Sequence, residues 1–148
     1  MVRSLRLLFL LLLLPFVLAG SAVAQVAVSS EEAAQAAPYN IRSIILRSKE
    51  LKGKLIKLQF VTRATGVESA ADGGLSGQVV DSPDTRLTQK VQVPEAAVAW
   101  FMNLPTTYTG GPGYTVYARL STDKFGSQVA TLLGRKLRPV GSGSMLDW

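Results

Sequence analysis

The chain has 148 residues with no histidine and no cysteine, and its 16 basic and 10 acidic side chains give a formal net charge of +6 at pH 7. The missing cysteine and histidine exclude disulfide bonds, lipidation of a cysteine, the usual serine or cysteine catalytic triads and most zinc sites. The length fits a single domain with one modest core.

The first 24 residues have the order of an export signal. Arg3 and Arg6 precede an apolar run from Leu7 to Leu18, and the small-x-small motif Ala22-Val23-Ala24 stands just before Gln25. The run is shorter than the roughly 20 apolar residues that a membrane span needs. We therefore expect residues 1–24 to be a signal peptide cleaved after Ala24, with a retained anchor as the alternative. Cleavage removes two arginines, which leaves a mildly basic periplasmic or secreted protein of net charge +4 with no stable membrane span.

Two terminal segments have compositions typical of flexible chain. Residues 25–38 consist largely of Ala, Ser, Glu and Gln, and residues 141–148 begin with Gly141-Ser142-Gly143-Ser144. Segments poor in large apolar side chains bury too little surface to offset the cost of ordering. The sequence therefore predicts a spacer over 25–38, a folded domain over 39–140 and a flexible tail over 141–148.

The folded region is expected to begin with a short helix from Tyr39 to Glu50, because Ile41, Ile44 and Ile45 recur at helical spacing. A half-buried strand follows, in which Ile56, Leu58 and Phe60 alternate with polar residues up to Arg63. Residues 65–77 are rich in Gly, Ala and Ser, which predicts a loop.

A hairpin is predicted next. Its strands cover residues 77–81 and 85–93, and Ser82-Pro83-Asp84 between them has the residues of a tight turn. In the second strand Leu87, Gln89, Val91 and Val93 share one face.

Pro94 and Glu95 open a predicted helix with the apolar stripe Ala97, Val98, Phe101 and Leu104. A strand from Tyr114 to Leu120 and a final strand from Val129 to Val140 complete the predicted order.

Three strands, a helix and two strands form the order of a five-stranded OB barrel. The chain resembles bacterial extracytoplasmic OB-fold domains of the tRNA-anticodon type in three short motifs: Leu51-Lys52-Gly53-Lys54-Leu55-Ile56-Lys57-Leu58, Tyr114-Thr115-Val116-Tyr117-Ala118-Arg119 and Leu132-Leu133-Gly134-Arg135. It departs from them at Gln59-Phe60 and Ser82-Pro83-Asp84, where many such domains have a glycine and an aspartate-glycine pair. The predicted fold is thus mainly β, an OB-like barrel with a helix between strands 3 and 4 and a short N-terminal helix. Another small barrel, such as an SH3-like one, and an open sheet with helices on one side are the alternatives.

The candidate binding site is the outer face of the first and fourth strands. OB domains use mixed cationic and aromatic side chains to follow a polyanion backbone and to stack rings. The residues of this kind are Lys57, Gln59, Arg63, Tyr117 and Arg119, with Lys54, Arg135, Lys136 and Arg138 as a possible extension. The alternative is an ordinary solvated sheet face.

Carboxylate pairs are the remaining candidates for catalysis. Asp81 and Asp84 are close in sequence, and Glu68 and Asp72 flank a glycine-rich loop, but turn and loop chemistry also explains them. We therefore predict a non-enzymatic binding module without a cofactor or metal, whose partner is an envelope or extracellular protein, glycan or polyanion. The alternatives are a polyanion or single-stranded nucleic-acid binding protein, which export disfavours, and a hydrolase that uses only carboxylates.

Overall fold

The computed structural model describes residues 25–148, and the predicted signal peptide lies outside the described residues. The described chain is mainly β, as the alternating patterns predict. Its strands form an eight-stranded sheet and a separate three-stranded sheet. Between residues 25 and 148, no helix has the length and apolar character needed to cross a membrane.

The larger sheet contains β2 (Pro38–Asn40), β3 (Leu55–Phe60), β4 (Thr62–Arg63), β5 (Glu68–Ser69), β6 (Leu75–Val80), β7 (Thr88–Val93), β8 (Tyr114–Thr122) and β9 (Gln128–Gly134). The strand order is β2-β3-β8-β9-β7-β6-β4, and β5 pairs with β6 outside that order. The pairs β2–β3 and β7–β9 are parallel, and the others are antiparallel. Because β2 and β4 stand at the two ends of the order, the pairings do not close the sheet into a barrel.

The period-two patterns place side chains as predicted. In β3, Leu58 and Phe60 are buried while Gln59 between them is exposed. The predicted hairpin is confirmed, since β6 and β7 are antiparallel with Val80 opposite Thr88 across the turn. One face of each strand therefore points into the core, and the other is free to carry polar groups.

Two short helices, α2 (Ile41–Leu46) and α3 (Ser48–Leu51), replace the single helix predicted from Tyr39 to Glu50. The side chain of Asn40 accepts a hydrogen bond from Ser43 N at 2.9 Å, which caps α2 and leaves Tyr39 to pair in β2. Arg47 has φ −112° and ψ 22°, outside the helical range, so the helix is interrupted there.

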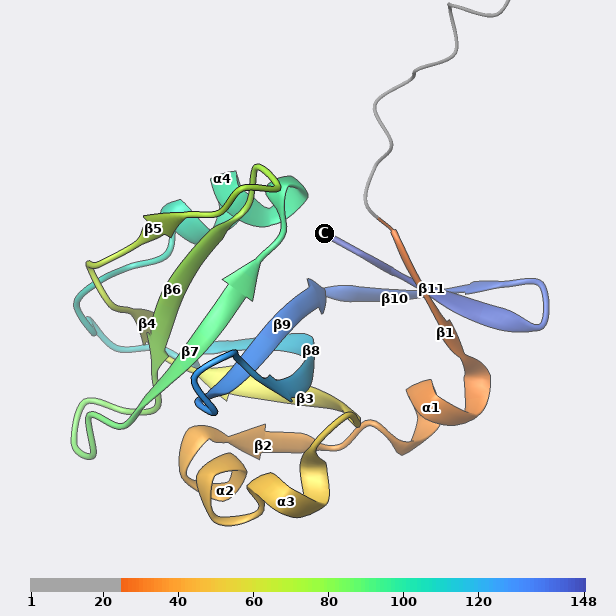
Figure 1. The fold of residues 1–148 in the computed structure, drawn as a ribbon, viewed down its shortest axis with the longest axis horizontal. Helices are drawn as coiled ribbons and strands as arrows, with labels where there is room; N and C mark the ends of the chain where they lie inside the picture. Colours follow the sequence, from red (N-terminus) through yellow and green to blue (C-terminus); the bar gives the residue numbers. More distant parts are fainter. Residues whose placement is uncertain (1–24) are drawn as a thin grey trace, which may run out of the picture.

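The predicted helix after Pro94 is confirmed as a 3₁₀ turn, η1 (Glu95–Ala97), followed by α4 (Val98–Met102). Phe101 is fully buried in the main core. A Cβ on Gly77 of β6 would lie 3.0 Å from two atoms of the Phe101 ring, so the glycine permits the ring to lie against the strand. Figure 1 shows α4 at one end of the larger sheet and α2 and α3 at the opposite end.

The smaller sheet joins the two ends of the described chain. It consists of β1 (Val26–Ser29), β11 (Gly143–Asp147) and β10 (Lys136–Val140), in that order and antiparallel throughout. Figure 1 shows these strands projecting to one side of the larger sheet. The predictions of a flexible spacer over 25–38 and a flexible tail over 141–148 are therefore wrong. Val28 and Leu146 are buried at 5% and 0% exposure, and each segment supplies the strand that the other needs.

The predicted final strand from Val129 to Val140 is also wrong, because the chain changes sheet near its middle. β9 ends at Gly134, where a Cβ would come within 2.8 Å of the Asp147 carbonyl oxygen. Arg135 N then donates to that same oxygen at 2.7 Å. The close approach of β11 bends the chain out of the larger sheet and into β10.

A second apolar cluster lies between the two sheets. Its buried members are Val28, Ala33, Ala36, Leu55 and Leu146, and Val26, Tyr117 and Leu133 pack against it. The alanines come from α1 (Ser30–Gln35) and its end; the hydroxyl of Ser29 accepts from Glu32 N at 3.0 Å and caps this helix. Because Leu55 and Tyr117 belong to the outward face of β3 and β8, the N-terminal segment covers part of the predicted binding face.

Candidate functional site

Part of the predicted site is assembled as expected on the outward face of β3 and β8. Lys57 and Tyr117 are opposite one another in register, and the Lys57 Nζ lies 5.7 Å from the centre of the Tyr117 ring. Gln59 follows on the same face and is exposed. Tyr117 is half-buried because it also packs against the second apolar cluster. The exposed remainder of this face is therefore small.

Arg119 is held by the N-terminal segment and is not free on the face. Its Nη1 forms an ion pair with Glu32 of α1 and donates to the Gly53 carbonyl oxygen at 2.9 Å. Both side chains of the pair are about one-third exposed, at 36% and 32%. The sequence prediction missed this contact because it treated residues 25–38 as a spacer.

Arg63 lies apart from the other predicted residues, on β4. Its guanidinium donates to the carbonyl oxygens of Met102 and Ala64, each at 3.2 Å. Met102 is the last residue of α4, so Arg63 satisfies a carbonyl that the helix leaves unpaired. Arg63 therefore has a structural role, and its replacement is not expected to be neutral for folding.

The four residues of the predicted extension are scattered. Lys54 is exposed in the turn before β3. The Arg135 guanidinium lies 5.2 Å from the Trp100 ring centre, while Arg138 Nε binds Asp147 Oδ2 at 3.1 Å within the smaller sheet. Lys136 is exposed at the start of β10. The structure does not bring these side chains onto the predicted face.

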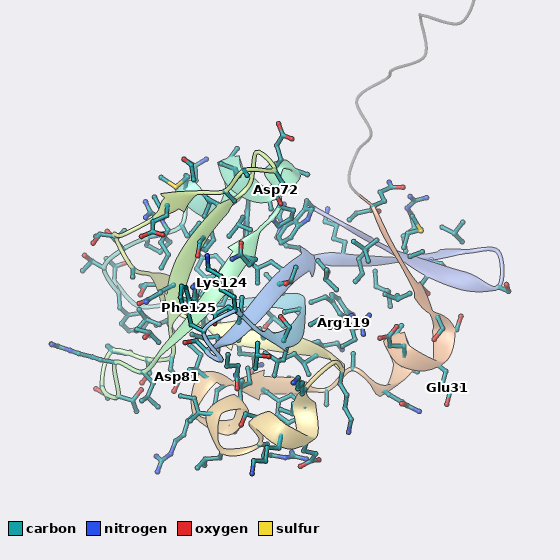
Figure 2. All side chains as sticks on the ribbon, viewed as in Figure 1. Glu31, Asp72, Asp81, Arg119, Lys124 and Phe125 are labelled. Atoms are coloured by element: carbon teal, nitrogen blue, oxygen red, sulfur yellow. The ribbon has the colours of Figure 1, made fainter. Side chains whose placement is uncertain are left out.

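The carboxylates considered for catalysis take part in local hydrogen bonds. Asp81 Oδ1 accepts from Ile41 N at 2.9 Å, and Asp72 Oδ1 accepts from Gly74 N at the same distance. Figure 2 labels these two aspartates well apart, Asp72 near α4 and Asp81 near α2. Each one fixes a turn or a helix start, which is the alternative that the sequence left open.

A different surface, the outward face of β6 and β7, has two hollows, and Gln78 and Lys90 line both of them. One open hollow of about 460 Å³ lies between this face and the loop after β4; its lining includes Val67, Glu68, Ser76, Gln78 and Lys90. A second, of about 430 Å³, extends toward α2 and the start of β9; its lining includes Ile45, Thr88 and Gln128, with Gln78 and Lys90 again. We call the outward face of β6 and β7 with these two hollows the β6–β7 face.

The turn from Asp123 to Ser127, between β8 and β9, stands beside the β6–β7 face. Asp123 Oδ1 accepts from Phe125 N and Ser127 N, each at 2.9 Å, and Asp123 Oδ2 binds Lys90 Nζ at 3.2 Å. The hydrogen bond from Ser127 N, with smaller contributions from Lys90 and Phe125 N, lowers the pKa of Asp123 below its ordinary value. The carboxylate thus fixes the shape of the turn and attaches it to β7.

This fixed turn presents an aromatic ring to solvent. Phe125 is 79% exposed, and the Lys124 Nζ lies 5.1 Å from its ring centre. Figure 2 shows both side chains near β7 and away from α1. The sequence analysis did not select these residues, although Asp123 followed by Gly126 three positions later is a turn pattern. An exposed aromatic ring on a held turn beside polar hollows has the features of a binding site.

Among residues 25–148, no cluster of three or more potential metal ligands is present. Comparisons with protein-family models, curated proteins and solved structures found no match for the chain. The resemblance to bacterial extracytoplasmic OB-fold domains therefore stays a prediction.

Proposed function

We propose that this chain is an exported, non-catalytic binding module with an OB-like arrangement, and that its ligand lies across the β6–β7 face. The order β3-β8-β9-β7-β6, read as strands 1-4-5-3-2 with strands 3 and 5 parallel, supports the OB-like arrangement. So does the short step from β3 to β4: only Val61 separates them, and β4 pairs with β6. If β3 and β4 are taken as one bent first strand, this strand pairs with β8 through β3 and with β6 through β4.

The observation that carries the binding proposal is the exposed ring of Phe125, whose backbone N–H is hydrogen-bonded in the turn beside the β6–β7 face. Exposing a phenyl ring costs apolar burial, and Asp123 holds the turn that presents it. The side chains that line the hollows include amides and hydroxyls, the apolar Val67 and Ile45, the carboxylate of Glu68, and one lysine that is already paired with Asp123. A surface of this kind suits a neutral polar chain such as a glycan: the ring contacts the apolar face of a sugar, and Gln78 and Ser76 provide hydrogen bonds.

The test is a titration of the ¹⁵N-labelled protein with chitotetraose, a soluble neutral oligosaccharide, followed by amide chemical shifts. We expect the shifts to change at Gln78, Lys90 and Phe125 and to stay constant at Gln59 on the other face. Phe125→Ala should weaken binding about tenfold, because the ring contributes about 1.4 kcal/mol of apolar burial in the complex. Tyr108→Ala is the matched control, since Tyr108 is an exposed aromatic residue (41%) outside both hollows. Absence of shifts on the β6–β7 face, or equal loss in both variants, would count against the proposed site.

Polyanion binding remains the second candidate, supported by the pairing of Lys57 with Tyr117 on β3 and β8. The ion pair of Arg119 with Glu32 reduces the positive charge available on that face. This candidate predicts shifts at Lys57 and Gln59 with oligo-dT, and an affinity that falls steeply as salt rises.

A further inference from the structure

The α2–α3 end of the molecule exposes two large apolar side chains, of which Ile45 borders the second hollow of the β6–β7 face and Leu46 does not. Leu46 is 77% exposed and Ile45 is 47% exposed. The inward side of α2 is already filled by Ile41 and Ile44, both at 0% exposure. Ile45 and Leu46 therefore contribute little to the core, although the helical spacing of the isoleucines predicts Ile45 on the buried side. Their exposure needs another explanation.

Basic side chains accompany these apolar residues. Arg42 stands three and four positions before Ile45 and Leu46, on the same side of α2. Three exposed lysines follow within the next eight residues, at positions 49, 52 and 54. In the described chain none of these four cations forms an ion pair.

The negative charge nearest in sequence is already neutralised. Glu50 is the only acidic residue between positions 42 and 54, and it forms a bidentate ion pair with Arg47. The segment from Arg42 to Lys54 therefore combines two exposed apolar side chains with four cations that form no ion pair among the described residues, and we call this segment the basic end.

We propose that the basic end docks onto a lipid bilayer that contains anionic phospholipids. Two exposed aliphatic side chains are too small an area for a stable protein interface, which needs about 1,200 Å² or more in total. A bilayer accepts single apolar side chains between its headgroups, and its phosphates attract several cations at once. Leu46 enters the headgroup region, and Arg42 and the three lysines lie at the level of the phosphates.

This docking is independent of the β6–β7 ligand. Ile45 also lines the second hollow, so Leu46 and the cations are the residues that test docking without altering the proposed ligand site. The basic end adjoins the β6–β7 face through Ile45, and a docked molecule would therefore hold that face close to the membrane surface.

The experiment uses the absence of cysteine from the chain. Leu46→Cys in the full chain provides a single thiol for the environment-sensitive dye NBD, and Val140→Cys is the matched control. Val140 is 46% exposed on the β10–β11 hairpin, away from the basic end. Each labelled protein is mixed with vesicles of phosphatidylcholine alone or with an equal part of phosphatidylglycerol. Because the dye reports only its own site, binding through another part of the chain does not imitate the expected result.

We expect the dye at position 46 to become brighter and blue-shifted with the anionic vesicles, and the dye at position 140 to be unchanged. When Arg42→Gln and Lys49→Gln are added to the protein labelled at position 46, the lipid concentration that gives half of the maximal fluorescence change should rise about 25-fold, which is about fivefold for each charge removed. Unlabelled wild-type chain should compete with the labelled protein better than Leu46→Ser does, which shows that the dye does not create the affinity.

Three results would overturn the proposal. They are no change at position 46, an equal change with neutral vesicles, and an equal change at both labelled positions. A response of the position-46 dye to oligo-dT that matches the response to vesicles would reassign the basic end to nucleic acid.

Discussion

Replacement of Leu146 by alanine tests whether the smaller sheet stabilises the fold. Leu146 has 0% exposure and lies between Val26 of β1 and Leu137 of β10, its register partners. Buried leucine-to-alanine changes cost about 2–5 kcal/mol, and the cost rises when the neighbours cannot fill the space. Two of the buried neighbours, Ala33 and Ala36, are too short to do so. We therefore expect the free energy of unfolding to fall by about 3–4 kcal/mol.

Leu137→Ala is the matched control. It removes the same three carbon atoms from the same face of the same sheet, but Leu137 is already 37% exposed. Its truncation leaves a depression that is open to water, so we expect a loss of only about 1 kcal/mol.

The two variants and the wild-type chain are compared by urea unfolding at 25 °C, followed by far-ultraviolet circular dichroism. The reasoning is refuted if the two variants differ from each other by less than about 0.5 kcal/mol, which is the size of an ordinary surface effect. If Leu146→Ala produces a second transition, the smaller sheet unfolds separately, and amide exchange of Val26 and Val28 then measures the same loss.

Two further predictions concern the loops beside the β6–β7 face. Gly74→Ala should destabilise the protein by more than about 2 kcal/mol, because a Cβ at position 74 would lie 2.3 Å from the Val93 carbonyl oxygen. Gly66→Ala is the control and should stay within about 0.5 kcal/mol, because a Cβ at position 66 meets nothing within 4 Å. Equal urea midpoints for the two variants would contradict this prediction. The lowered pKa of Asp123 means that its contribution is present above the ordinary carboxyl pKa of about 3.9 and is lost as pH falls through the lowered value. Below about pH 4, the rate of hydrogen exchange at Ser127 N in the wild-type chain should therefore rise relative to the rate in the Asp123→Asn variant. Equal pH profiles for the two proteins would show that the carboxylate does not hold the turn.

The five longer strands of the larger sheet (β3, β6, β7, β8 and β9) were predictable because each is encoded by a local pattern, whereas the short β2 and β5 were not predicted. Ile56, Leu58 and Phe60 alternate within one strand, and Pro83 and Asp84 mark the turn of the next hairpin, so each pattern identifies its own element. The common face of Lys57 and Tyr117 followed from placing two such strands side by side, and the structure adds that the two residues are register partners. The closed barrel was the part of the fold prediction that the pairings do not establish.

The smaller sheet was not predictable in this way. Val26 and Val28 form only a two-residue alternation among small side chains, and their partners lie near the other end of the chain. The ion pair of Arg119 with Glu32 depends on that distant pairing, so the sequence prediction overestimated the number of free cations on the face of β3 and β8. Phe125 was missed for a different reason: an exposed ring in a turn has no periodicity, and only its hydrogen-bonded setting distinguishes it.

The pairing of β1 with β11 also constrains the timing of folding. Val26 lies opposite Leu146, so the first described strand has no partner until residues 143–146 have been synthesised. The larger sheet needs only residues up to Gly134, and it can assemble while the chain is still emerging. Ordering of β1 must come afterwards, and a change that removes β11 from the smaller sheet would leave β1 without a partner strand. The order of residues 26–29 therefore depends on whether residues 143–147 have been synthesised and are intact, because β11 is the one strand that β1 pairs with among the described residues.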